Sequence, residues 1–382
     1  MKPTRKERFK DFILIFVRQL AKIWMFIDMR STHELRDGIK FNRKEPYVML
    51  ANHTFMFDVI HVPLYFRRPP FIVASDTLFN KFPLNFLLNH VAHAIPKSKG
   101  ASDLRTAKAL ITAVKKNYPI LIFPEGDTTF FGETNYIEES TYKLIKKLKI
   151  DVITCNVKGG YLSRPRWATG KRKNRKIHLT YEIAISKEEL ATMTVEEIEE
   201  RIKKHLYNND YAYQQEKMIP HPGNKLAEGF ENVAYICPEC NSINSIKSSG
   251  NFLYCEHCKN EGSINEYGFI EGFKFDNLIE WDKYQRKFIP ELRNSTFETD
   301  ADLYYADFKS GKDNFVGIVD LKFSDGEFFF TGALEENLLL KDIVNPTVTM
   351  RRNLSFTYGD RNFFLRLNKN VASFLRIAQE KY

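Results

Sequence analysis

Short apolar runs alternate with helical segments from about residue 40 to residue 186, and this alternation limits the folds that the chain can adopt. Residues 102–116 are a helical segment, because Leu104, Ala107, Ile111 and Val114 recur at helical spacing. Such alternation is typical of an α/β sandwich with a largely parallel sheet, so we expect the α/β fold class. The predicted strands are residues 47–51, 71–74, 91–95, 120–123, 152–157 and 177–185.

His53 and Asp58 follow the first of these strands and are candidates for chemistry. His53 stands just after the apolar run 47–51, and Asp58 lies five positions later. A carboxylate that accepts from one ring nitrogen of a histidine fixes the tautomer and leaves the other nitrogen free to take a proton. The pair therefore suits a general base. By spacing alone the signal is weak, since most such pairs are surface or core residues.

Glu125 and Gly126 form a second candidate, at the end of the apolar strand predicted at residues 120–123. The sequence of residues 119–126 is Pro-Ile-Leu-Ile-Phe-Pro-Glu-Gly. It predicts a short buried strand that runs into a turn, and the turn delivers a carboxylate and a flexible glycine. In α/β sheets ligands bind at this end of the strands. Context therefore favours a site that combines both candidates.

Four segments resemble, in order, the motifs of the glycerolipid acyltransferase family, whose prototype is 1-acyl-sn-glycerol-3-phosphate acyltransferase. Residues 52–58, Asn-His-x4-Asp, resemble its first motif, and residues 123–126, Phe-Pro-Glu-Gly, resemble its third. Residues 94–97 stand where the second motif carries a phosphate-binding arginine, and residues 152–157 resemble the fourth. The chain departs from the pattern at residues 127–129, where Asp-Thr-Thr replaces a Thr/Ser-Arg pair, and near Ser140, where a glycine is common.

The resemblance implies an acyltransferase α/β sandwich and a role for each motif residue. His53, oriented by Asp58, would act as the general base on a glycerol hydroxyl that attacks an acyl thioester. Lys97, with Lys99 as the alternative, would hold the acceptor's phosphate in place of arginine, without arginine's bidentate fork. Glu125 would accept from acceptor hydroxyls, and Gly126 would let the backbone approach the substrate.

The implied reaction belongs to phospholipid biosynthesis. An acyl group would pass from acyl-acyl carrier protein or acyl-coenzyme A to 1-acyl-glycerol-3-phosphate, giving phosphatidic acid. A different lysophospholipid or glycerol 3-phosphate is the alternative acceptor. No organic cofactor is expected, and no acyl-enzyme is needed because two bound substrates supply the proximity.

A basic region follows the fourth motif. Arg164 and Arg166 are held by a proline and flanked by Trp167, so we expect them to bind substrate. Residues 171–176, Lys-Arg-Lys-Asn-Arg-Lys, form a charge cluster that would dock an anionic donor or lie on anionic lipid. The alternative for this cluster is a solvated hairpin tip.

Residues 1–30 predict an amphipathic helix that associates with a membrane. Arg8, Asp11, Arg18 and Lys22 fall on one stripe, and aromatic and aliphatic residues occupy the rest, so we expect the apolar side in the bilayer and the basic residues at the headgroups. The formal net charge of +9 favours an anionic partner, and the 32 phenylalanines and 18 tyrosines favour lipid over nucleic acid. We therefore expect a peripheral location on the cytoplasmic face of the cell membrane. The alternative is a helix that packs on its own domain.

Cysteine usage indicates a metal site in a reducing compartment. Cys237, Cys240, Cys255 and Cys258 form two Cys-x2-Cys pairs, which resemble a zinc ribbon. Four thiolates close the coordination shell, so we expect structural zinc without catalysis. Cys155, in an apolar strand, is expected to be a small buried hydrophobe.

The last segment, about residues 277–382, is rich in strand signals and ends in an amphipathic helix. The order resembles a pleckstrin-homology or GRAM-like barrel, with Arg351, Arg352 and Arg361 as headgroup candidates. The predicted organisation is a membrane-associating helix at 1–30, an acyltransferase domain at 31–230, a zinc ribbon at 231–270 and a mostly-β domain at 275–382.

Two alternative functions would not involve catalysis. A zinc ribbon with a basic surface also occurs in nucleic-acid-binding proteins, but here His53, Asp58 and Glu125 would need separate explanations. A degenerate acyltransferase that binds lipid without turnover is the other alternative.

Overall fold

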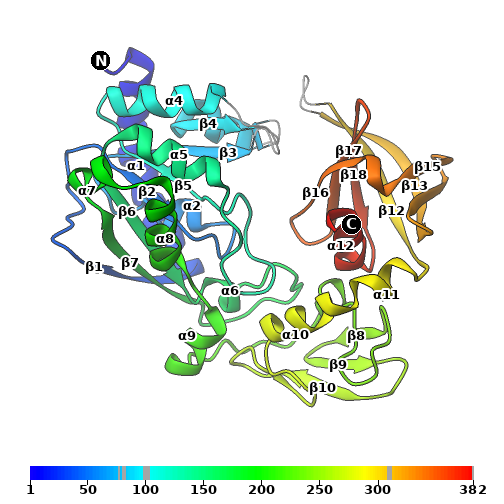
Figure 1. The fold of residues 1–382 in the computed structure, drawn as a ribbon. Helices are drawn as coiled ribbons and strands as arrows, with labels where there is room; N and C mark the ends of the chain where they lie inside the picture. The colour runs from blue at the N-terminus through cyan, green and yellow to red at the C-terminus, as the bar shows by residue number, and fades with distance from the viewer. Residues whose placement is uncertain (76–77, 80–82, 98–103, 308–311, 381–382) are drawn as a thin grey trace. The chain divides into compact units, whose positions relative to one another are not determined.

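The computed structural model describes residues 1–75, 78–79, 83–97, 104–307 and 312–380 (Figure 1). The chain divides into two compact units. Met1–Ser163 and Asn174–Lys217 form the first unit, and Arg164–Lys173 and Met218–Tyr382 form the second. The chain therefore passes from one unit to the other at three points. The four predicted domain ranges stay predictions.

A seven-stranded sheet forms the centre of the first unit, in the order β1-β7-β6-β2-β5-β3-β4. The central strands β2 to β6 run parallel, β7 is antiparallel to β6, and β1 is parallel to β7. The carboxyl ends of β2, β5 and β6 therefore meet at one edge. The bounds are β1 Arg30–Leu35, β2 Val48–Ala51, β3 Phe71–Ser75, β4 Ala94–Lys97, β5 Ile120–Ile122, β6 Val152–Lys158 and β7 Lys176–Ile185.

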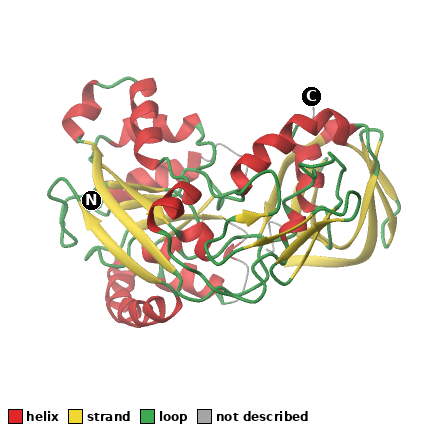
Figure 2. Ribbon diagram, turned by 90° about the horizontal axis from the view of Figure 1, so that it is seen from below, coloured by secondary structure: helices red, strands yellow, loops and turns green. Residues whose placement is uncertain are grey.

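Helices cover both faces of this sheet (Figure 2), which is why β2 and β5 at its centre are apolar at every position. Alternate residues, such as Leu50 and Ile122, pack against α4, α5 and α8. Their neighbours, such as Met49 and Leu121, pack on the opposite face with Met29 and Phe55. The helices on the first face are α4 Leu104–Lys115, α5 Glu139–Leu148, α7 Lys187–Thr192 and α8 Val195–Leu206.

All six predicted strands are present, with one shifted. Strand β4 occupies Ala94–Lys97 rather than residues 91–95, because Leu87–Val91 form a π-helical turn, η2, after the short helix α3 (Leu84–Phe86). Strand β1 was not predicted. Helix α9, at Asp210–Lys217, was not predicted either.

Helix α1 (Arg5–Asp28) starts with a capping box formed by Thr4 and Glu7. Two residues of its polar stripe, Asp11 and Arg18, form hydrogen bonds within the first unit. Asp11 accepts hydrogen bonds from Tyr118 Oη at 2.6 Å and pairs with His93 Nε2 at 2.8 Å. Arg18 donates to backbone carbonyls at residues 63–67, among them Leu64 O at 2.7 Å.

The apolar side of α1 therefore faces outward. Its exposed large side chains are Phe9, Phe12, Ile15, Phe16, Leu20, Ile23, Trp24, Phe26 and Ile27. This arrangement corrects part of the sequence-based expectation. Asp11 and Arg18 do not face lipid headgroups, because both are engaged inside the unit. Within the described residues, no helix combines the length and apolarity needed to cross a membrane.

The second unit contains a small sheet, a larger sheet and the helices α10, α11 and α12. The small sheet has the order β11-β10-β9-β8, and the larger has the order β15-β14-β13-β12-β18-β17-β16. The elements are β8 Ile246–Ser249, β9 Phe252–Cys255, β10 Glu261–Ile264, β11 Ile270–Glu271, α10 Leu278–Gln285, α11 Ile289–Arg293, β12 Phe297–Asp307, β13 Lys312–Ser324, β14 Glu327–Gly332, β15 Glu336–Leu339, β16 Ile343–Thr349, β17 Asn353–Tyr358, β18 Arg361–Leu367 and α12 Val371–Gln379.

Helices α10 and α12 connect the two sheets of this unit. Trp281 in α10 donates from its indole nitrogen to Ile236 O at 2.9 Å. The buried carboxylate of Asp282 accepts from Arg376 of α12 at 3.0 Å and from Arg286 at 2.8 Å. A mostly-β region closed by one helix is thus present. Its likeness to a pleckstrin-homology or GRAM-like barrel stays a prediction.

Candidate active site

The ends of three neighbouring strands carry the site. His53 follows β2, and Glu125 follows β5, which pairs with β2 on one side. On the other side Asn52 ties the end of β2 to β6, because its side chain donates to Val157 O at 2.9 Å and accepts from Val157 N at 2.7 Å. The parallel topology therefore brings His53 and Glu125 together although seventy-two residues separate them.

Asp58 orients His53 and holds the loop between them. Its carboxylate is fully buried, and its Oδ2 lies 3.3 Å from His53 Nδ1. The same oxygen accepts the backbone N–H groups of Thr54 at 2.6 Å and Phe55 at 3.0 Å. Because backbone donors fix the carboxylate, the imidazole is held with Nδ1 toward Asp58 and Nε2 away from it.

Glu125 clamps two loops together. Its Oε1 accepts the backbone N–H of His53 at 2.7 Å, and its Oε2 accepts that of Asn135 at 2.6 Å. Burial raises the pKa of this carboxyl to about 8, with Asp58 and Asp127 adding to the rise and the two backbone donors opposing it. Both oxygens thus already hold the backbone in place, so the geometry supports a positioning role for Glu125.

Gly126 and Phe123 shape the turn beside His53. Gly126 has φ of +73°, and no atom lies within 4 Å of the position that a Cβ would take. The turn therefore needs glycine for its conformation and leaves open space above the backbone. The ring of Phe123 lies 4.5 Å from the imidazole of His53 between centroids.

The two lysines predicted to bind phosphate are placed differently. Lys97 ends β4, at the same sheet edge as His53, and its side chain is exposed. Three strand spacings separate β4 from β2 in the sheet order, a distance of about 14 Å. Lys99 lies outside the described residues.

The structure places Arg164 and Arg166 in the second unit, whereas His53, Asp58 and Glu125 belong to the first. The guanidinium of Arg166 donates to Met350 O at 2.7 Å and to Val348 O. In the basic cluster that follows, Arg172 is buried and Arg175 pairs with Asp28 at 3.1 Å. The expectation that residues 171–176 present all their charges to a donor or to lipid is therefore wrong for these two arginines.

Two residues that were not predicted, Gly160 and Asp210, hold the backbone segment that packs against the loop of His53. Gly160 packs so tightly against the loop of His53 that a Cβ would lie 2.1 Å from Thr54 Oγ1. Asp210 is fully buried and accepts the backbone N–H groups of Gly159 at 2.9 Å and Tyr161 at 2.7 Å. Burial raises the pKa of Asp210, against the backbone donors. The sequence Asn208-Asn209-Asp210, rich in side chains that cap backbone, was the available signal.

The four paired cysteines form a separate cluster in the second unit. Their sulfur atoms all lie within 4.8 Å of one another. The Sγ atoms of Cys237 and Cys258 are 3.9 Å apart, and those of Cys240 and Cys255 are 3.8 Å apart. A tetrahedral ion with metal–sulfur bonds of about 2.3 Å places its ligands about 3.8 Å apart, so the cluster fits zinc.

Comparison with known proteins agrees with the site in the first unit. The Acyltransferase family model matches residues 32–158, which include β2 to β6, His53, Asp58 and Glu125. The first unit thus contains a region that is similar to acyltransferase domains.

The solved structures that are similar to the chain include one of an acyltransferase. It is the crystal structure of the 1-acyl-sn-glycerophosphate (LPA) acyltransferase PlsC from Thermotoga maritima, with 17% sequence identity over 56% of this chain and 84% of that chain and a TM-score of 0.42. No curated protein matches the chain.

Proposed function

We propose that the protein transfers a fatty acyl group from an acyl thioester to the free hydroxyl of 1-acyl-glycerol-3-phosphate, giving phosphatidic acid. The observation that carries the proposal is the pair of His53 and Asp58. A fully buried carboxylate, fixed by backbone donors, lies 3.3 Å from Nδ1 of a histidine at the sheet edge. The other ring nitrogen is then the acceptor for a proton.

The chemistry follows from this pair. Nε2 of His53 takes the proton of the acceptor's hydroxyl while its oxygen attacks the thioester carbonyl. The carbon–sulfur bond breaks as the tetrahedral intermediate collapses, and the imidazolium returns its proton to the departing thiolate. Asp58 stabilises the imidazolium between these steps. General-base assistance of this kind contributes about 10²- to 10⁴-fold to the rate.

The acceptor would reach the site from a membrane that covers the outward side of α1. Trp24 on that helix packs edge-on against Phe57, in the loop between His53 and Asp58, at 4.9 Å between centroids. Met56, the residue before Phe57, is exposed. An apolar surface therefore continues from the helix to the loop that holds His53. Lys97 is proposed to bind the acceptor's phosphate, and the cytoplasmic face of the cell membrane is the proposed location.

The four cysteines are proposed to hold a structural zinc ion. Zinc would fix the small sheet of the second unit and supply no catalytic step, since four thiolates fill its coordination. Residues 231–270 carry five glutamates and two lysines, a net charge of −3. This charge disfavours the alternative in which the ribbon binds nucleic acid, because such binding needs cations that neutralise phosphate.

The test is phosphatidic acid formation on liposomes that contain 1-acyl-glycerol-3-phosphate, with acyl-acyl carrier protein and acyl-coenzyme A as donors. We expect turnover by the wild type and at least a 100-fold loss in His53→Ala. His178→Ala, a histidine on β7 that pairs with Glu34, is the matched control and should retain activity. Absence of turnover on this acceptor, on other lysophospholipids and on glycerol 3-phosphate would refute catalysis.

A second experiment tests whether the apolar side of α1 binds the membrane. Phe16 on α1 is 59% exposed, and Phe252 in the small sheet of the second unit is 67% exposed. We expect Phe16→Ser to reduce co-sedimentation with phosphatidylglycerol vesicles severalfold, because it removes apolar area from the proposed contact. Phe252→Ser is the matched control. An equal loss in both variants would contradict a specific role for α1.

A further inference from the structure

Helix α1 contacts the segment that carries Asp58 on both sides of that residue. Asp58 is the first residue of the short helix α2 (Asp58–His61), and hydrogen-bonded turns follow this helix. Before α2, Trp24 of α1 packs edge-on against the ring of Phe57, at an interplanar angle of 78°. After α2, Arg18 of α1 donates hydrogen bonds to the backbone of the turns. The proposed catalytic carboxylate therefore lies between two contacts with α1.

Arg18 supplies hydrogen bonds that the turns after α2 need. Its guanidinium donates to Pro63 O at 2.9 Å, Leu64 O at 2.7 Å and Arg67 O at 3.1 Å, and also to Phe66 O. Among the described residues, the carbonyls of Leu64, Phe66 and Arg67 accept hydrogen bonds from this guanidinium alone. Carbonyls at the end of a helical segment attract a cation, and a buried carbonyl that loses its partner destabilises the conformation that buries it. Arg18 therefore holds these turns in place.

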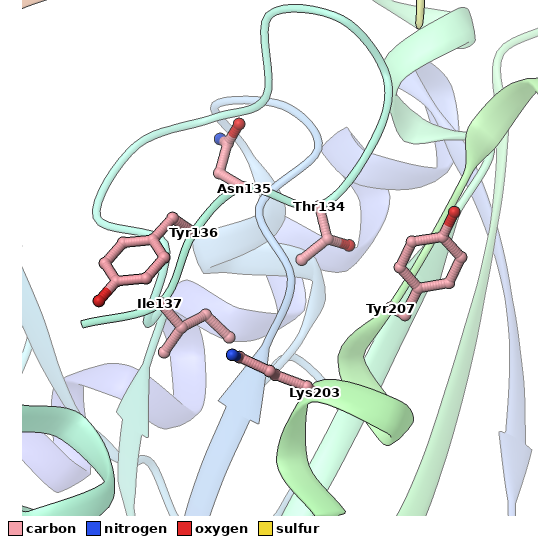
Figure 3. Close-up of a pocket in the computed structure, with 6 residues that line it drawn as sticks. All are labelled: Thr134, Asn135, Tyr136, Ile137, Lys203 and Tyr207. Carbon is pink, nitrogen blue, oxygen red and sulfur yellow. The ribbon is translucent and has the colours of Figure 1, made fainter. Parts of the chain in front are cut away.

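His53 is held by different contacts, which come from the sheet edge and from the loop that follows β5. Its N–H donates to Glu125 at 2.7 Å, and its carbonyl accepts from Thr129 N at 2.9 Å. Glu125 also accepts from Asn135, which lies on a loop in the wall of a hollow of about 260 Å³ (Figure 3). Thr134, beside Asn135, is hydrogen-bonded to the backbone at the end of α8. The backbone of His53 is thus fixed by the sheet and this loop.

The contact between Asp58 and His53 is the one most sensitive to movement of α2. Oδ2 of Asp58 accepts from Thr54 N at 2.6 Å and from Phe55 N at 3.0 Å, whereas its distance to His53 Nδ1 is 3.3 Å. The contact with the imidazole is longer than most N–H···O hydrogen bonds, so a small displacement abolishes it. If the turns after α2 loosen, the helix can tilt, and the imidazole then loses its partner before the backbone of the loop does.

We infer that Arg18 is a positioning residue for the acyl transfer, and that α1 supports the active site in addition to its proposed contact with the membrane. The inference rests on the proposed function. Arg18 acts through the turns after α2, which fix Asp58, and Asp58 orients His53. Trp24 supports the other end of α2 through Phe57. Loss of the Arg18 side chain should therefore slow acyl transfer even when the acceptor is dissolved in water and no membrane is present.

The test removes the membrane from the reaction. Turnover is measured with 1-hexanoyl-glycerol-3-phosphate, at concentrations where this short-chain acceptor is monomeric, and with acyl-acyl carrier protein or acyl-coenzyme A as donor. We expect Arg18→Gln to lower kcat by about 10- to 100-fold and to leave the KM of both substrates unchanged, because a catalytic group displaced by about 1 Å loses rate while the binding sites stay intact. Arg18→Lys keeps the charge and an N–H donor group, so it should recover part of the lost kcat.

A matched control makes the same chemical change elsewhere on the same helix. Arg5 is exposed at the start of α1, and Arg5→Gln should have the kcat of the wild type. A folded Arg18→Gln protein with the wild-type kcat would overturn the inference. An equal fall of kcat in Arg5→Gln, or a loss that appears only as a raised KM, would also overturn it.

An independent variant covers the case in which circular dichroism shows Arg18→Gln to be unfolded. Trp24→Leu removes the ring contact with Phe57 and should lower kcat severalfold. The inference is then tested by Trp24→Leu together with Arg18→Lys, and a wild-type kcat in both variants would overturn it.

Hydrogen–deuterium exchange separates this inference from the proposed function, since it needs no substrate. In the full-length protein, Arg18→Gln should speed the exchange of the backbone amides of residues 54–67 relative to the wild type and to Arg5→Gln. If the wild type transfers no acyl group to any acceptor, the proposed function is refuted, and faster exchange in this segment would still support the role of Arg18 in fixing α2. Unchanged exchange in this segment would overturn the inference whether or not the protein transfers acyl groups.

Discussion

Replacing Asp58 by asparagine separates the structural role of this side chain from its catalytic role. Asparagine keeps one oxygen, which can take the position of Oδ2 and still accept the N–H groups of Thr54 and Phe55 and face His53 Nδ1. Its amide nitrogen then takes the position of Oδ1, 3.3 Å from the Thr54 hydroxyl, which can accept from it. The loop should therefore keep its conformation while the negative charge is lost.

The cost in stability follows from these contacts. A hydrogen bond to a charged group contributes about 1.5–3 kcal/mol and a neutral one about 0.5–1.5 kcal/mol, so each of the two backbone bonds loses about 1 kcal/mol. The buried charge is also removed, which offsets part of that loss. We expect the free energy of unfolding to fall by about 1–2 kcal/mol. The rate should fall much further, about 10³-fold, because nothing then stabilises the imidazolium.

The assay combines denaturant unfolding with single-turnover acyl transfer at a temperature where circular dichroism shows the variant to be folded. His53→Ala is the companion variant, since it removes the base and leaves the Asp58 contacts to Thr54 and Phe55 in place. Both variants should lose activity to a similar extent, and His53→Ala should lose less stability. A folded Asp58→Asn protein within tenfold of the wild-type rate would refute the proposed role of Asp58.

Three further predictions concern the metal, the pH dependence and the backbone behind the site. Chelation, or Cys255→Ser, should lower the thermal midpoint of unfolding and release zinc, measured by calorimetry and a chromogenic indicator; an unchanged midpoint would contradict a structural metal. Because burial raises the pKa of Glu125 from 4.5 to about 8, the folded state retains a proton that the unfolded chain releases. The free energy of unfolding should therefore fall as pH rises through this window, by at most about 1.4 kcal/mol per pH unit. Glu125→Gln should flatten that slope. An unchanged slope in this variant would contradict the raised pKa of Glu125 as its cause. Gly160→Ala should cost about 1–3 kcal/mol in denaturant unfolding and reduce turnover, because its Cβ would collide with Thr54 Oγ1; wild-type behaviour would contradict the packing.

The central strands were predictable because helices cover both of their faces. Runs such as Val48–Ala51 are then apolar at every position and stand out from the flanking sequence. Strand β1 lies at the sheet edge, with the sequence Arg-Ser-Thr-His-Glu-Leu and no fully buried residue, so no apolar run marks it. Helix α9 was missed for a related reason, since its buried residues include Asp210 and Gln214.

The candidate site was predictable where its partners are close in sequence. His53 and Asp58 are five residues apart, and their contact could be expected from the resemblance of residues 52–58 to an acyltransferase motif, since spacing alone is a weak signal. The hydrogen bonds of Glu125 could not be predicted, because one of them comes from the backbone N–H of Asn135 in an irregular segment. The outward orientation of α1's apolar side was predicted, whereas the inward hydrogen bonds of Asp11 and Arg18 depend on partners more than forty residues away.

Because the chain crosses between the two units three times, cleavage at one site cannot separate them. A truncated protein that ends at Lys217 would keep residues 164–173 but lose everything against which they pack. Trp167 is buried and packs edge-on against Phe230, at 5.2 Å between centroids, and Arg166 donates to Met350. Such a fragment would carry an exposed tryptophan and an arginine without its carbonyl partners. The C-terminal part is thus not a detachable module, and limited proteolysis near residue 217 should leave the two fragments associated.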